Sequence, residues 1–161
     1  MSQLTHFDEQ GASRMVDTSS KPETERLARA RCRVQMLPTT VLLMRNKGIV
    51  KGDVFEVARL AGIMAAKKTS DLIPLCHPLS LTSICVDFSY SGEDSIDISA
   101  TVRSFGRTGV EMEAMTAVTV SALTIYDMCK SVDRAMTITQ VQLIEKTGGK
   151  TGTFVRHEPK E

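Results

Sequence analysis

An acid and an amine one helical turn apart are the residues of this sequence best suited to chemistry. Asp127 and Lys130 stand near the end of the mostly apolar stretch 110–132. Ionised groups are costly to bury unless they are paired or used, so a catalytic pair would explain them on a buried helix. A structural ion pair in the last helical turn is the alternative, since the charge of Lys130 also suits the negative end of the helix dipole.

A loop between two prolines carries a histidine. Pro74 and Pro78 each fix φ, so the loop that holds Cys76 and His77 is expected to be rigid and could present His77 to a ligand. A lone loop histidine is more often an ordinary surface residue. No second histidine accompanies Cys76 in a catalytic arrangement, which favours a structural role for this thiol.

Several segments raise the question of phosphate binding. The motif 106–109, Gly-Arg-Thr-Gly, leads into a predicted helix whose free N–H groups could bind an anion together with Arg107, although Glu111 in the first turn opposes this and the glycines could simply form the turn. Residues 146–152 resemble a P-loop, but Ile144 replaces the first glycine and too few residues follow for a helix. Lys51, just ahead of another predicted helix, is either a second anion contact or a solvated charge.

Length and composition indicate a single domain of 161 residues, with an extended arm at 1–28, a core at 29–150 and a flexible tail at 151–161. A net charge of +1 argues against the field typical of nucleic-acid and membrane-surface proteins. The four cysteines lack C-x-x-C spacing, which argues against zinc and disulfides and favours the reducing cytoplasm. No stretch has the length and apolarity of a membrane span or secretion signal.

Apolar periodicity predicts a strand, a helix, two strands, a second helix and a last strand. They are expected at 30–36, 53–68 with Asp53 and Glu56 as a capping box, 83–90, 96–103, after Gly109 to about 130, and 138–146. The order predicts an α+β, ferredoxin-like fold: a four-stranded antiparallel sheet with both helices on one face and a polar opposite face. The second helix is apolar on nearly every side, which predicts a homo-oligomer with this helix near an interface.

Five segments together resemble the cyclic pyranopterin monophosphate synthase family, the C proteins of molybdenum cofactor biosynthesis. They are Lys51-Gly-Asp-Val54, Ala61-Gly-Ile63 with Ala65-Ala-Lys67, Leu72 to Leu79, Gly106-Arg-Thr-Gly-Val-Glu-Met-Glu113 and Thr124 to Lys130. The resemblance extends from Met15 to Lys150. It implies conversion of 3′,8-cyclo-7,8-dihydroguanosine triphosphate into cyclic pyranopterin monophosphate with release of diphosphate, by a homohexamer that is a trimer of dimers with active sites at subunit interfaces.

The same resemblance implies roles for particular residues. Asp127 is the expected acid/base and Lys130 and Lys51 its partners; the expected substrate contacts are Leu75, Cys76, His77, Met112 and Glu113, and those for phosphate are Lys67, Lys146 and Arg26. A carboxylate and an amine suit the proton transfers of such a ring rearrangement, and cations offset the triphosphate charge. No redox cofactor and no metal site in the protein are implied. Whether Mg²⁺ accompanies the triphosphate and whether Lys130 acts as acid or base stay open.

The spacing of Glu113 and Asp127 adds a geometric constraint. Fourteen helical residues separate them, which corresponds to about 21 Å. One compact pocket can hardly use both from one chain, so a site shared between subunits is expected.

Two other functions are compatible with parts of this sequence. RNA-recognition modules share this order of elements, but they stack bases on sheet aromatics, and the predicted strands 30–36 and 96–103 contain none. A regulatory domain that binds a small molecule would need no acid–amine pair. The sequence therefore favours an enzyme without nucleic-acid or membrane partners.

Overall fold

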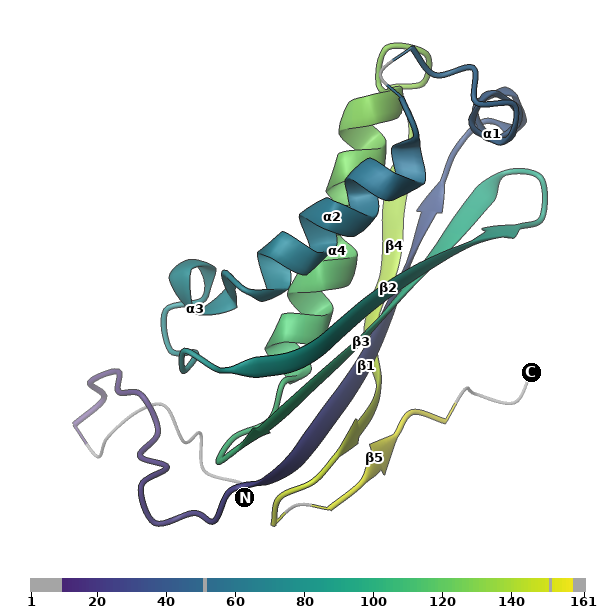
Figure 1. Cartoon of the computed structure of the whole chain (residues 1–161). Coiled ribbons are helices and arrows are strands. Elements are labelled where there is room, and N and C mark those ends of the chain that lie inside the picture. Colours follow the sequence, from purple (N-terminus) through teal and green to yellow (C-terminus); the bar gives the residue numbers. More distant parts are fainter. Residues whose placement is uncertain (1–9, 51, 151, 158–161) are drawn as a thin grey trace.

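The chain folds into one antiparallel sheet with its two long helices on one face (Figure 1). The computed structural model describes residues 10–50, 52–150 and 152–157. The elements are β1 Thr24–Gln35, α1 Pro38–Arg45, α2 Val54–Ala66, α3 Thr69–Leu72, β2 Leu81–Ser91, β3 Ser95–Gly106, α4 Glu111–Cys129, β4 Thr137–Thr147 and β5 Phe154–Val155. The strand order β2-β3-β1-β4-β5 contains the split pattern predicted, so the α+β class is confirmed.

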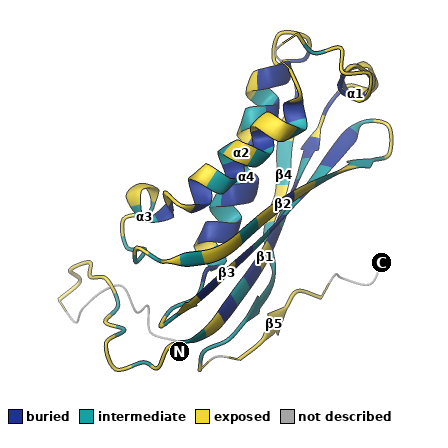
Figure 2. Cartoon of the chain, viewed as in Figure 1, coloured by how far each residue is buried: buried dark blue, intermediate teal, exposed yellow. Residues whose placement is uncertain are grey.

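The sheet has one apolar and one polar face because its strands alternate. Along β1, Ala30, Cys32 and Val34 are buried beneath the helices (Figure 2). On the opposite face Arg29 lies 3.4 Å from Glu145, and Arg33 lies 2.6 Å from Asp97. Such cross-strand pairs keep this face polar, as predicted.

Two predicted boundaries are wrong at the ends of the sheet. β1 begins at Thr24, inside the segment assigned to the arm, because Arg26 occupies a core-facing position and hides the apolar alternation. The sheet has a fifth strand where a flexible tail was predicted, since Phe154 pairs with Lys146. Residues 1–9, Lys51, Thr151 and 158–161, which include parts of the predicted arm and tail, lie outside the described residues.

The short helix α1 was not predicted because its stabilising contacts come from far along the chain. Its N-cap residue, Leu37, has no side chain able to cap it. Instead the buried carboxylate of Asp133 accepts from Leu37 N at 2.8 Å and from Thr40 Oγ1 at 3.3 Å, and from Ala135 N at 3.0 Å with its other oxygen. Asp133 thereby ties the loop after α4 to the start of α1.

Helices α2 and α4 pack closely and run antiparallel. Ser121 Oγ in α4 donates to Ala58 O in α2 at 3.0 Å, and one turn later Gly62 lies against Ala117 and Ser121. The contact is lined by small residues, which lets the two backbones approach each other. The start of α2 is therefore placed beside the end of α4.

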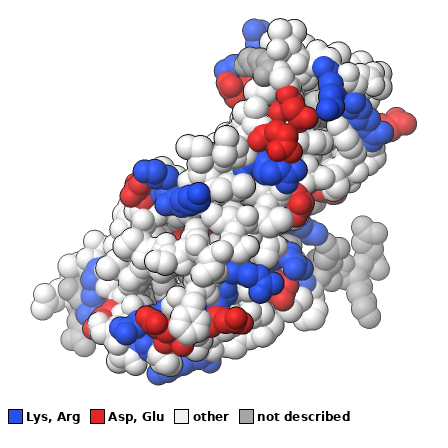
Figure 3. All heavy atoms as spheres, viewed as in Figure 1, with Lys and Arg blue, Asp and Glu red and all other residues white. Residues whose placement is uncertain are grey.

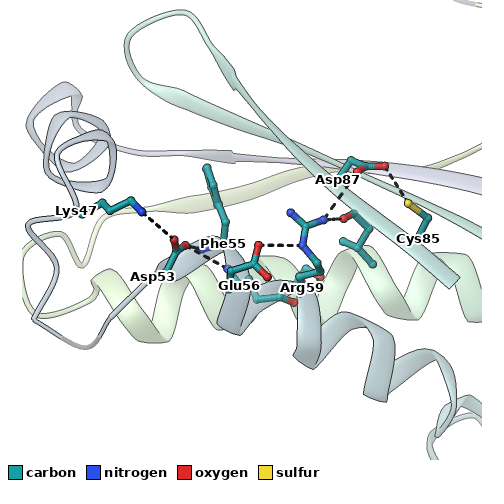
Figure 4. A network of polar contacts seen from close by, with 10 residues as sticks. Lys47, Asp53, Phe55, Glu56, Arg59, Cys85 and Asp87 are labelled. Carbon is teal, nitrogen blue, oxygen red and sulfur yellow. Dashed lines mark hydrogen bonds and ion pairs between the residues drawn. The ribbon is translucent and has the colours of Figure 1, made fainter.

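Polar contacts fix α2 at its start and against β2 (Figure 4). Asp53 accepts from Phe55 N and Glu56 N, which confirms its predicted capping role, whereas the Glu56 side chain pairs with Arg59 at 3.2 Å. Arg59 also donates to Val86 O on β2 and lies over the ring of Phe88. These contacts hold α2 at a fixed position along the sheet.

Candidate active site

The residues expected to form the site fall into two groups at opposite ends of α4. Glu113 lies in its first turn and Asp127 in its last, about 21 Å apart at the helical rise. The other expected substrate and phosphate contacts belong to the group around the start of α4: Leu75, Cys76, His77, Met112, Lys67, Arg26 and Lys146. Lys130 follows the last turn, and the residues that flank Lys51 lie at the nearby start of α2 (Figure 1).

At the end of α4, Lys130 Nζ donates to Asp127 Oδ1 at 2.6 Å. The two side chains are 51% and 59% exposed, so the expectation that they are buried is wrong for the single chain. The pair is exposed because it lies on the side of α4 that faces away from the core. Ile125, Met128 and Cys129 face the core, whereas Asp127 lies one turn after Leu123, which is 53% exposed. A closed site around the pair therefore requires atoms beyond the described residues of this chain.

The segment on either side of Lys51 is anchored at both ends. Lys51 itself lies outside the described residues. Gly52 N donates to Ile49 O at 3.1 Å, and Lys47 Nζ lies 3.8 Å from the capping carboxylate of Asp53 (Figure 4). These contacts tie the residues that flank Lys51 to the start of α2.

At the other end of α4, Glu113 is buried. Only 4% of it is exposed, and desolvation raises its pKa to about 7, with a lowering contribution from a backbone N–H and a raising one from Glu111. Burial and the charge of Glu113 also raise the pKa of the half-buried Cys76, so the loop that contains Leu75 lies near Glu113. Within this loop His77 Nε2 contacts Val16 O at 2.8 Å. The structure thus brings the loop and Glu113 together.

Replacement of Glu113 by glutamine is expected to change the pH dependence of stability. In the folded chain the carboxyl stays protonated up to about pH 7, whereas the unfolded chain ionises it near the usual value of 4.5. Unfolding then releases a proton, so stability falls as pH rises between these values, by about 3 kcal/mol in total. Glu113→Gln should abolish that fall, as measured by urea unfolding below pH 5 and above pH 8. If the free energy of unfolding changes with pH in the same way for both proteins, the pKa of Glu113 is not raised.

A basic hollow of about 480 Å³ adjoins the first turn of α4. Its basic lining residues are Lys21, Arg26, Arg107, Lys146 and Lys150, with Glu111 as its acid. Arg26 is buried, and its Nε donates to Gly106 O at 3.0 Å. A side chain at Gly149, where φ is +76°, would come within 1.9 Å of Arg26 Nη1, so this glycine leaves the space that the guanidinium fills.

The hollow brings two of the residues expected to contact phosphate together and leaves a third outside it. It brings Arg26 and Lys146 together from β1 and β4, although they are far apart in sequence. Lys67, in contrast, is exposed at the end of α2 and does not line the hollow. Lys21 also lines the hollow, although the sequence did not single it out because it lies in the segment assigned to the arm. Met112 is 39% exposed on the outward stripe of α4.

Other kinds of site find little support in the described part of the chain. There, no three His, Cys, Asp or Glu side chains cluster in a way that could hold a metal ion. Among the same residues no helix is both long and apolar enough to cross a bilayer. Acidic and basic side chains are interspersed over the face seen in Figure 3.

Comparison with known proteins identifies the family. The MoaC family profile matches residues 15–149. The chain is 57% identical over 159 residues to a cyclic pyranopterin monophosphate synthase of Thermomicrobium roseum, covering 98% of this chain and 96% of the relative. It is also 57% identical to the enzyme of that name from Heliobacterium modesticaldum, over 98% of this chain and 100% of the relative, and to cyclic pyranopterin monophosphate synthase 3 of Mycobacterium tuberculosis, over 96% and 88%. The chain therefore belongs to the MoaC family.

Proposed function

We propose that the protein is a cyclic pyranopterin monophosphate synthase of molybdenum cofactor biosynthesis. It would convert 3′,8-cyclo-7,8-dihydroguanosine triphosphate into cyclic pyranopterin monophosphate and release diphosphate. The observation that carries this proposal is the 57% identity to synthases over almost the whole of this chain and of theirs. The acid–amine pair and the basic hollow supply the chemistry that such a reaction requires.

In this proposal Asp127 moves protons between nitrogen and oxygen atoms of the substrate. Its 2.6 Å contact with Lys130 allows the two groups to share a proton. Lys51, which precedes α2 in the sequence, is proposed to complete the set. Leu75, Cys76, His77, Met112 and Glu113 are proposed to contact the ring system.

The basic hollow is proposed to hold the triphosphate. Five cations around one space can offset several negative charges while diphosphate leaves. Arg26 and Lys146 remain the proposed phosphate contacts, from the neighbouring strands β1 and β4, with Lys67 as a more distant cation.

We further propose that the site is completed by a second copy of the chain. The hollow and Asp127 lie at opposite ends of α4, whereas one substrate must contact both. Exposed apolar side chains on α2 and α4, including Leu60, Met64 and Leu123, offer a surface for such a copy. By resemblance the assembly is a hexamer built as a trimer of dimers. The exposed free thiol of Cys85 suits a reducing compartment, and we propose the cytoplasm.

Loss of the proposed acid/base should abolish turnover without unfolding the protein. With the cyclised nucleotide supplied, Asp127→Asn is expected to lower the rate of diphosphate release by about 10²–10⁴-fold, because proton transfer loses its carrier. Since this side chain is exposed, stability should stay within about 0.5 kcal/mol of the unmodified protein.

Asp71 offers a matched control, because it forms an exposed pair with Lys68 at the same i,i+3 spacing, at 3.5 Å. Asp71→Asn should keep the normal rate. An Asp127→Asn protein as fast as this control would remove Asp127 from the mechanism. Absence of diphosphate release by the unmodified protein would favour a non-catalytic binding domain.

A further inference from the structure

Residues 16–23 form a compact segment beside the start of α4, which we call the strap. Asp17 Oδ1 accepts from Ser19 N at 2.8 Å and from Ser19 Oγ at 2.6 Å, which lowers the pKa of this carboxyl. Lys21 N donates to Thr18 O at 3.0 Å. The strap therefore has a defined turn of its own, in a part of the chain where the sequence predicted only an extended arm.

His77 contacts the strap through one ring nitrogen. Its Nε2 lies 2.8 Å from Val16 O, and a carbonyl oxygen can only accept a hydrogen bond. Nε2 must therefore carry the hydrogen, which leaves Nδ1 for another partner. The ring is half-buried, so this contact also limits its rotation.

Arg107 makes a second contact with the strap. Its Nη1 donates to Ser19 O at 3.0 Å, and its Nε lies 3.7 Å from Glu23 Oε1. Between these two contact points the strap turns back toward β1, and Lys21 lines the basic hollow together with Arg26. The guanidinium thus holds the segment that carries Lys21.

We propose that the strap is part of the substrate site: Val16 fixes the tautomer of His77 so that Nδ1 serves the substrate, and Arg107 is a positioning residue that places Lys21 on the phosphate groups. This inference rests on the proposed function. The inference gives the 106–109 motif the role of holding the strap. From the sequence alone, this motif could either bind an anion directly or simply form a turn.

The first test replaces Arg107 in the full-length protein. Arg107→Gln is expected to raise KM for the cyclised nucleotide about tenfold, the effect of losing one charge-assisted contact, with kcat within about twofold. Backbone amides of residues 17–21 should exchange hydrogen faster. Arg156→Gln is the matched control, because Arg156 Nε also donates to a main-chain carbonyl, Leu143 O at 2.8 Å, but lies outside the hollow. Unchanged KM and unchanged exchange in Arg107→Gln would overturn the inference.

A double replacement separates positioning from direct contact. Lys21→Gln alone should raise KM to a similar extent without faster exchange of the strap. If Arg107 acts through Lys21, the double variant should be no worse than either single variant. If the two increases in KM multiply in the double variant, Arg107 contacts phosphate independently of Lys21, which would overturn its positioning role.

The tautomer of His77 can be measured without any turnover. Nitrogen chemical shifts of the neutral imidazole should show Nε2 protonated and Nδ1 unprotonated. The reverse assignment would overturn the role of Val16. Because the exchange and tautomer measurements do not depend on catalysis, failure of the inference can be distinguished from failure of the proposed activity.

Discussion

When mixed and allowed to exchange subunits, inactive Glu113→Ala and Asp127→Ala proteins should recover about a quarter of the unmodified activity, the fraction expected for random pairing in a two-fold dimer. Glu113 is buried at the start of α4 and Asp127 is exposed at its end, about 21 Å away. Each site is expected to use the start of α4 from one subunit and the end of α4 from the other. A dimer of one Glu113→Ala and one Asp127→Ala subunit then has one intact site and one doubly altered site. Diphosphate release after mixing is the measurement.

A second mixture controls for nonspecific rescue. Asp127→Ala and Lys130→Ala change the same end of α4, so no mixed pair contains an intact site and no recovery is expected. Exchange itself can be confirmed by mass spectrometry of subunits with different masses. Proven exchange without recovery in the first mixture, or equal recovery in both, would refute a site shared in this way.

The second large effect concerns the contact between α2 and α4. Gly62→Ala should lower the free energy of unfolding by about 2 kcal/mol, within the range of core overpacking, although alanine normally stabilises an exposed helical position by about 1 kcal/mol. A Cβ at Gly62 would lie 2.2 Å from Ser121 Oγ and 2.9 Å from Ala117 O. The helices must separate to accept it. Urea unfolding at a fixed protomer concentration measures the change.

Ser121→Gly provides a background that tests this explanation. Removal of the Ser121 side chain removes the closest clash, so Gly62→Ala should cost less there, although Ala117 O still limits the space. The same loss in both backgrounds would mean that Ser121 is not the obstacle. A gain in stability for Gly62→Ala alone would mean that the helices do not approach this closely.

Local pattern alone predicted much of the fold. The alternation in β2 and β3 indicated a hairpin because side-chain direction in a strand has a period of two, and Asp53 marked the start of α2 because its carboxylate caps its own helix. Elements that depend on remote residues were missed. α1 is capped by Asp133, and β5 exists only through its pairing with β4.

For the candidate site, the sequence by itself determined which residue types are available: the acid–amine pair at the end of α4, the histidine loop and the lysines. Their spacing along α4 also required two separate groups, because helical rise is fixed by backbone geometry. Only the tertiary structure decided their surroundings. In the folded chain Asp127 is exposed, Glu113 is buried, and the carbonyl oxygen of Val16 contacts the ring of His77. Burial and long-range contacts depend on how β1, α4 and the strap pack together.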